Sequence, residues 1–263
     1  MQGQARSLSG GQQTDPFVAR LGRFVDLAPA DLSNLHDIIR QELTVRKRRD
    51  LVVDGYEFGN LCFVMDGFAV RYKLLRNGKR QIVNLVLPGD VIGLPGSFVE
   101  RARFSVVTVT DMKLQVCALD DFVALCYRQP KFGLVLAWLG IEESLTYASH
   151  IVNIGRRTPA ERLAHVLVEL HARLSTVGRA GPHAFDLPFS QEVLSDALGL
   201  SVPHLNRMLA RLRKDRLITV DGRLITFIDR KALELLGHYQ PLELRRVPPP
   251  GNHSRTGASL RAK

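Results

Sequence analysis

The stretch QEVLSDALGLSVPHLNRMLA, residues 191–210, carries the most specific pattern in this chain. Apolar residues at helical spacing stand on both sides of Gly199, a residue type that readily adopts the positive φ of a tight turn. Ser195 is small, as the close crossing of two helices requires. Six or seven positions of this stretch agree with the pattern of a helix-turn-helix, so we expect that motif rather than an ordinary corner between two helices. The predicted core-facing residues are Leu194, Leu198, Leu200, Leu205, Met208 and Leu212.

The same periodicity predicts which side chains of the second helix point outward. Arginine can bond guanine bidentately and asparagine can bond adenine in the same way. Hydroxyl groups and helix N-termini hold phosphates, and Ser190 and Ser201 are also expected to cap the two helices. The predicted DNA-contacting residues are Ser190, Ser201, Val202, Pro203, His204, Asn206, Arg207, Arg211, Arg213 and Lys214.

The residues around this motif complete a winged DNA-binding domain, predicted over residues 156–239. Two strands, Leu217–Val220 and Arg223–Ile228, are joined across Asp221-Gly222. Asp229 can cap a last short helix. At the other end, Thr158-Pro159-Ala160-Glu161 has the form of a capping box with proline at the first helical position. The motif therefore lies in a domain of its own.

Positive charge is concentrated in this part of the chain. The whole sequence has 263 residues and a formal net charge of +10. Residues 1–155 contain 18 basic and 16 acidic side chains, whereas residues 156–263 contain 18 and 10. A basic domain attracts DNA through phosphate neutralisation and counterion release. No run of 18 apolar residues and no signal segment occurs, so we expect a cytoplasmic protein that does not bind a membrane.

Between Leu43 and Ala124 the pattern changes to short β-rich runs with turn residues between them. Such spacing is typical of a small barrel or roll, and Asn77-Gly78 predicts a type I′ hairpin turn. The fold class is therefore α+β, with a small β-roll or barrel in an N-terminal domain over residues 16–131. Residues 1–15 and 240–263 are predicted to be disordered tails. The predicted strands are Leu61–Met65, Phe68–Leu75, Gln81–Leu87, Val106–Val109 and Leu114–Val116.

A long helix is predicted from Phe132 to Val152. Its apolar residues step by four and three alternately, which is the spacing of a coiled-coil seam. We expect a dimerisation helix over residues 132–155, and packing on the chain's own barrel is the alternative. The predicted seam consists of Leu134, Trp138, Ile141, Leu145, Ala148 and Val152.

In the order of these parts, from Phe17 to Tyr239, the sequence resembles the Crp/Fnr regulators. The resemblance implies that the β-roll of residues 16–131 is a double-stranded β-helix (jelly-roll-like) sensor domain like a cyclic-nucleotide-binding domain. It further implies that a long dimerisation helix and a C-terminal winged helix follow it. It also implies a homodimer that binds two-fold symmetric promoter DNA and works with RNA polymerase. The motifs that carry it are MDG with Gly67, NGKRQI with Gly78, LPGD with Gly89 and Asp90, Ser105-Val106, TPAERLA, and LGLSVPHLNRML with the wing after it.

The sequence departs from the family at two places. Relatives that bind cyclic AMP have Gly-Glu-Leu and Arg-Ser-Ala segments, where this chain has Gly93-Leu94-Pro95 and Phe104-Ser105-Val106. The carboxylate and the phosphate-binding arginine are both missing, so cyclic AMP is not the expected effector. The effector is unknown, its site is expected near Gly93 and Ser105, and a cyclic-nucleotide-responsive regulator is the alternative function. Pro203 replaces the family's usual glutamate, so the preferred half-site is expected to differ.

Other chemistries find little support in the sequence. Cys62, Cys117 and Cys126 are too few and too scattered for a disulfide framework or a zinc site, and we expect buried apolar side chains. Residues 1–61 contain no cysteine for an iron–sulfur cluster, and His150 and Met65 are expected to be structural rather than haem ligands. Residues 37–149 contain no histidine, which makes a cupin-like metal-dependent enzyme the least favoured alternative. We therefore predict no catalytic residue, metal or cofactor.

Overall fold

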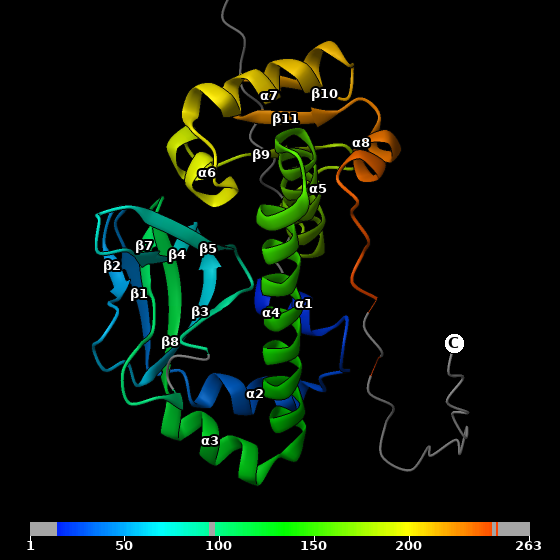
Figure 1. The fold of residues 1–263 in the computed structure, drawn as a ribbon. Helices are drawn as coiled ribbons and strands as arrows, with labels where there is room; N and C mark the ends of the chain where they lie inside the picture. The colour runs from blue at the N-terminus through cyan, green and yellow to red at the C-terminus, as the bar shows by residue number, and fades with distance from the viewer. Residues whose placement is uncertain (1–14, 95–97, 244–245, 247–263) are drawn as a thin grey trace, which may run out of the picture.

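The computed structural model describes residues 15–94, 98–243 and 246. A β-roll, a long helix and a winged helix-turn-helix domain follow one another along the chain (Figure 1). Most of the two tails lies outside the described residues. Asp15, at the edge of the first tail, accepts a hydrogen bond from the backbone N–H of Phe17 at 2.8 Å. In the second tail, the Leu242 carbonyl accepts one from Arg23 at 3.3 Å.

The β-roll consists of two four-stranded antiparallel sheets, which confirms the predicted fold class. One sheet has the order β1-β8-β3-β6 and the other the order β2-β7-β4-β5. Fully buried side chains from both sheets, among them Val64, Ala69 and Val106, fill the space between them. The strands are β1 (Gln41–Val45), β2 (Asp50–Val52), β3 (Asn60–Asp66), β4 (Ala69–Leu74), β5 (Arg80–Val86), β6 (Val91–Ile92), β7 (Ser105–Thr108) and β8 (Met112–Ala118).

The β4–β5 hairpin turns differently from the sequence prediction. Gly78 has φ +78°, but Asn77 is not among the residues with positive φ, so the type I′ turn is wrong. The Leu75 carbonyl accepts from the Gly78 N–H at 2.9 Å, and the Lys79 carbonyl accepts from the Leu75 N–H at 2.8 Å. This is a longer loop in which one glycine alone adopts the left-handed conformation.

Among the described residues, four helices complete the first half of the molecule. Phe17 and Leu21 of the first helix are buried beside Phe63 of β3, and Phe122 of the third helix joins the same cluster. The fourth helix then runs along the roll towards the C-terminal domain (Figure 1). These helices are α1 (Pro16–Leu21), α2 (Pro29–Asp37), α3 (Leu119–Arg128) and α4 (Pro130–Arg156).

The C-terminal domain is built around a buried helix, α5. The Glu161 carboxylate accepts a hydrogen bond from the Thr158 N–H at 2.8 Å, so the predicted start of this helix is confirmed. Its sheet has three strands in the order β10-β11-β9, and β9 comes from a segment that is not among the predicted strands. The elements are α5 (Pro159–Thr176), β9 (Ala184–Asp186), α6 (Gln191–Leu198), α7 (Val202–Lys214), β10 (Ile218–Asp221), β11 (Leu224–Phe227) and α8 (Arg230–Leu236).

Two kinds of feature are absent from the described residues. No helix in that part of the chain is both long and apolar enough to cross a membrane. Nor do the same residues contain a group of three or more histidine, cysteine or acidic side chains that could hold a metal ion.

Candidate nucleic-acid interface

α6 and α7 form the helix-turn-helix that the sequence predicts. Gly199 has φ +63°, and the Leu200 N–H donates to the Ser195 carbonyl at 2.9 Å, which closes the turn. Arg162 of α5 donates to the Leu198 carbonyl at 3.1 Å and ties the end of α6 to the domain core. The residues buried beneath the motif are Leu194, Ser195, Leu198, Leu205 and Leu212.

The two predicted helix caps have different outcomes. The Ser190 hydroxyl accepts a hydrogen bond from the Val193 N–H at 3.4 Å at the start of α6. Ser201 occupies the N-cap position of α7, but its side chain makes no capping hydrogen bond. The hydroxyl of Ser201 is exposed at the start of α7, where phosphates can bind.

Most of the predicted contact residues lie on the exposed face of α7. Val202 and His204 differ, because both are half-buried. Arg211 pairs with Asp215 at 3.6 Å, one turn further along the helix. Within the described part of the chain, neither Arg213 nor Lys214 makes an ion pair, so both cations are available to an anionic partner. The exposed residues are Pro203, Asn206, Arg207, Arg211, Arg213 and Lys214.

One residue of this surface is absent from the sequence prediction. The Gln191 side-chain oxygen accepts a hydrogen bond from the Asn206 amide at 2.9 Å, which joins the first turn of α6 to the outward face of α7. Gln191 follows the N-cap Ser190, so its exposure could be expected from the sequence. Its pairing with a residue on the other helix could not, because it depends on the crossing angle of α6 and α7.

An apolar stripe runs along the exposed side of α4. Leu134, Ile141, Leu145 and Val152 each leave about half of the side chain exposed, between 46% and 56%. Ala148 lies on the same exposed side. These five members of the predicted seam are therefore accessible to a second molecule.

Trp138 is the exception to the predicted seam. It is 3% exposed and stacks on Phe24 with ring centroids 4.9 Å apart, so it belongs to the core of its own chain. Exposed Ala137 takes its place in the stripe. Heptad spacing alone does not distinguish a core residue from a seam residue.

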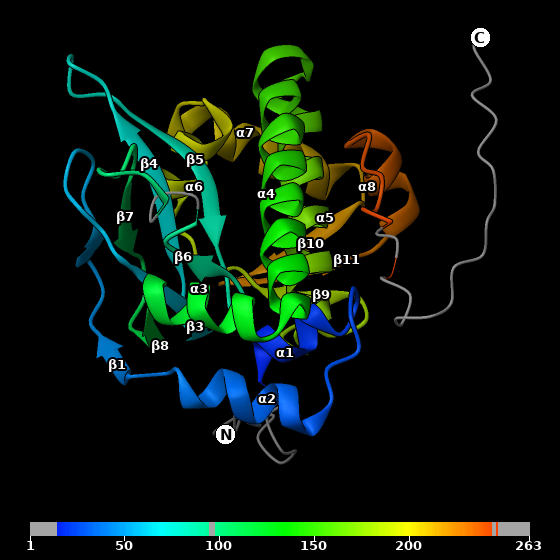
Figure 2. The same ribbon diagram turned by 90° about the horizontal axis from the view of Figure 1, so that it is seen from below.

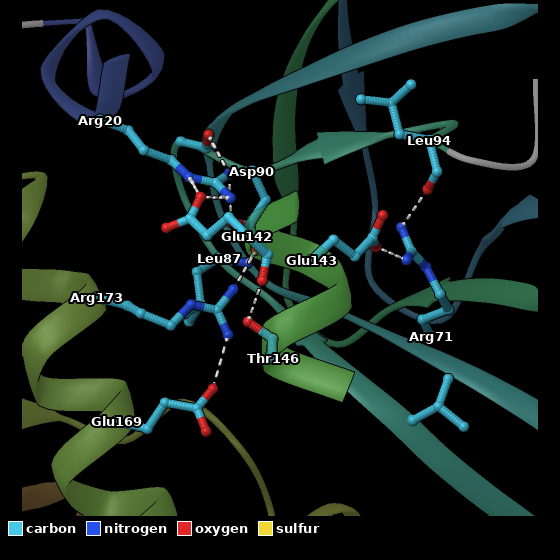
Figure 3. A network of polar contacts seen from close by, with 12 residues as sticks. Arg20, Arg71, Leu87, Asp90, Leu94, Glu142, Glu143, Thr146, Glu169 and Arg173 are labelled. Carbon is cyan, nitrogen blue, oxygen red and sulfur yellow. Dashed lines mark hydrogen bonds and ion pairs between the residues drawn. The ribbon is translucent and has the colours of Figure 1, made fainter. Parts of the chain in front are cut away.

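The region near Gly93 and Ser105 contains a buried cation that the sequence analysis missed. Leu94 and Phe104 occupy the two positions where the sequence differs from relatives that bind cyclic AMP, and both are buried. Arg71 of β4, 2% exposed, donates to the Leu94 carbonyl at 3.0 Å and lies 4.4 Å from the centre of the Phe104 ring. Its guanidinium also pairs with Glu143 of α4 (Figure 3). Arg71 and Glu143 thus form an ion pair of the chain itself between the roll and α4, on the wall of a cavity of about 360 Å³.

A second polar network connects α4 to the domains on either side of it. Arg20 of α1 bonds Glu142 of α4 at 2.6 Å and Asp90 at 2.9 Å (Figure 3). Arg173 of α5 bonds the other oxygen of Asp90 at 2.6 Å and Glu169 at 3.3 Å. The roll, the long helix and the DNA-binding domain therefore share one chain of ion pairs.

His150 is part of the same network rather than a free haem ligand. One ring nitrogen lies 2.9 Å from Glu169, and the other lies 3.2 Å from the Val83 carbonyl. Burial alone would raise the pKa of Glu169, but the charge and hydrogen bond of His150, with nearby Arg173, lower that pKa to about 2. Both ring nitrogens of His150 have partners, as a structural role requires.

The DNA-binding domain also touches the roll directly, through α6. Arg80 at the start of β5 bonds Asp196 of α6 at 2.5 Å, and the Gln81 side chain donates to the Asp196 carbonyl at 3.1 Å. α6 lies beside β5, while α7 is on the far side of the motif from the roll (Figure 1). In both views α4 lies between the roll and α8 (Figure 2). The DNA-binding domain contacts the rest of the chain both through α6 at the roll and through α5 at α4. These contacts leave the outward face of α7 exposed.

Comparison with known proteins agrees with this architecture. Residues 42–129 match the family model for the cyclic nucleotide-binding domain, and residues 161–236 match the model for the Crp-like helix-turn-helix domain. FixK2 from Bradyrhizobium japonicum has a similar structure, with a TM-score of 0.70 and 26% identity over 76% of this chain and 98% of that chain.

Two curated relatives give the same result. The transcriptional activator protein FnrL of Cereibacter sphaeroides is 28% identical over 66% of this chain and 70% of its own length. The nitrogen fixation regulation protein FixK of Rhizobium meliloti is 28% identical over 80% of this chain and 92% of its own length. With its cyclic-nucleotide-binding-like β-roll and Crp-like helix-turn-helix, the chain belongs to the Crp/Fnr family of transcriptional regulators, which are not enzymes.

Proposed function

We propose that this regulator acts as a homodimer that binds a two-fold symmetric promoter site. The observation that carries the proposal is the exposed outward face of α7, on which Asn206 and Arg207 lie with two further cations. These are Arg213 and Lys214, which make no ion pair with any residue that the structure describes. Asparagine and arginine are the side chains best suited to bidentate contacts with adenine and guanine. A cytoplasmic location and contact with RNA polymerase accompany this proposal.

The apolar stripe of α4 supports the dimer. A row of apolar side chains at heptad spacing is buried when two such helices pack in parallel. Two copies related in this way would present their α7 helices to major grooves roughly one DNA turn, about 34 Å, apart. A single α7 helix reads too few base pairs for a specific site, so the dimer is needed for specificity.

We divide the contact residues by chemistry. Asn206 and Arg207 read base edges, and Pro203 lies beside them where it can offer only an apolar contact. Ser190, Ser201, Arg213 and Lys214 hold phosphates at the ends of the two helices. The site that results differs from that of relatives with a glutamate at position 203.

No cyclic-nucleotide response is included in the proposal. A buried cyclic phosphate needs a cation to offset its desolvation. The buried guanidinium beside these positions, that of Arg71, already pairs with Glu143 of α4. Leu94 and Phe104, at the departing positions, offer neither a carboxylate nor a cation.

Two variants distinguish contacts with bases from contacts with phosphates. We expect Arg207→Ala to weaken binding to the specific site by about 1–3 kcal/mol and to leave binding to scrambled DNA nearly unchanged, since a base contact is lost. We expect Lys214→Ala to weaken both DNAs similarly and to lower the salt slope by about 1, since a phosphate contact is lost.

Titration of both variants with both DNAs across a salt series measures these effects. Lys214→Ala is the matched control, because it removes an exposed cation from the same helix. Equal weakening of both DNAs by Arg207→Ala would mean that Arg207 only contacts phosphate, and that α7 does not lie in the groove as we propose.

A further inference from the structure

The hydrogen bond between Gln191 and Asn206 has a defined direction. The Asn206 amide nitrogen donates, and the Gln191 side-chain oxygen accepts, at 2.9 Å. Both residues are exposed, on different helices, at the surface that we propose meets DNA. Neither side chain is needed to fill the core beneath the motif.

This bond leaves Asn206 with one free N–H and a free carbonyl oxygen. An amide nitrogen carries two hydrogens, of which Gln191 takes one. The remaining donor and acceptor match adenine in the major groove, where N7 accepts and the N6 amino group donates. Guanine presents two acceptors, N7 and O6, and would need both amide hydrogens of the asparagine.

We propose that Gln191 is a positioning residue that holds the Asn206 amide in the orientation that reads adenine. The proposal rests on the proposed function, and it assigns a base preference to one position of the half-site. Fixing the amide before binding also lowers the conformational entropy that Asn206 loses on binding. Gln191 acts through Asn206, so its removal should change selectivity at a single base pair.

Three substitutions at Gln191 separate this role from a structural one. Glutamate can only accept, so Gln191→Glu should keep the orientation of Asn206 and the adenine preference. Alanine offers no acceptor, so Gln191→Ala should reduce the adenine preference about ten-fold, which corresponds to about 1.4 kcal/mol. Lysine can only donate, so Gln191→Lys should turn the Asn206 oxygen towards itself and shift the preference towards guanine.

The experiment is selection of bound sequences from random DNA by the full-length wild type and the three variants. The ratio of affinities for adenine and guanine at the affected position is then measured for each protein. A ratio is insensitive to the charge that Gln191→Glu and Gln191→Lys introduce, because that charge acts on all sequences alike. Gln115→Ala, which removes a glutamine from the roll, is the control and should leave the ratio unchanged.

The outcomes distinguish the two proposals. Two results together support the inference. The wild type selects a symmetric site, and the adenine-to-guanine affinity ratio decreases from Gln191→Glu through Gln191→Ala to Gln191→Lys. An unchanged ratio in all three variants overturns the inference and leaves the proposed function standing. A wild type that selects no sequence overturns both. Thermal unfolding of Gln191→Ala close to that of the wild type shows that the change in ratio is not a folding defect.

Discussion

The substitution Leu145→Asp is expected to convert the regulator into monomers and to abolish binding to the full DNA site. Leu145 is 46% exposed in the single chain, so an aspartate there is tolerated by the fold of the protomer. In a parallel dimer the two introduced carboxylates would face each other in an apolar seam, where their desolvation is not compensated. A monomer binds only one half-site, so it loses the increase in affinity, about 10²–10⁴-fold, that comes from binding two half-sites at once.

Sedimentation and DNA titration of Leu145→Asp test this result together. Tyr127→Asp is the matched control, because Tyr127 is 85% exposed on α3 and lies outside the stripe. It should leave both the dimer and the DNA affinity unchanged. A Leu145→Asp dimer as strong as that of the wild type would place the interface somewhere other than α4.

The second large effect concerns the buried pair of Arg71 and Glu143. Removing one member of a buried ion pair leaves the other charge without compensation, at a cost of roughly 3–5 kcal/mol. We expect Glu143→Ala to lower the free energy of unfolding by that amount, because Arg71 is 2% exposed. Urea unfolding measures the loss. An apolar replacement of both, Arg71→Met with Glu143→Leu, should recover most of it.

An exposed ion pair of the same roll provides the comparison. Lys73 and Asp54 lie 2.7 Å apart with side chains 44% and 39% exposed. We expect Asp54→Ala to cost less than about 1 kcal/mol, because water screens an exposed pair. A loss no larger for Glu143→Ala than for Asp54→Ala would show that Arg71 does not depend on Glu143.

The helix-turn-helix was the part of the fold that the sequence predicted best. Helical periodicity is a local property, and it determined both the buried leucines and the outward face of α7. The role of Gly199 as the turn residue was equally predictable, because a turn of this kind needs a residue with positive φ. The half-burial of Val202 and His204 depends on packing between helices, which periodicity does not describe.

Features that depend on distant partners were missed. Trp138 fits the heptad pattern, yet Phe24 from the N-terminal segment covers it. Arg71 lies in a strand, and its partner Glu143 is on α4, far along the chain. Gln191 is paired with Asn206 only because two helices cross at a particular angle. In each case the sequence shows the residue but not the contact.

Selection of bound sequences from random DNA by the wild-type protein tests the central claim most directly. The account predicts a two-fold symmetric consensus whose half-site centres are about 10–10.5 base pairs apart, because two α7 helices on a parallel dimer enter successive major grooves. Enrichment of a single asymmetric half-site bound at full affinity, or no enrichment at all, would contradict it.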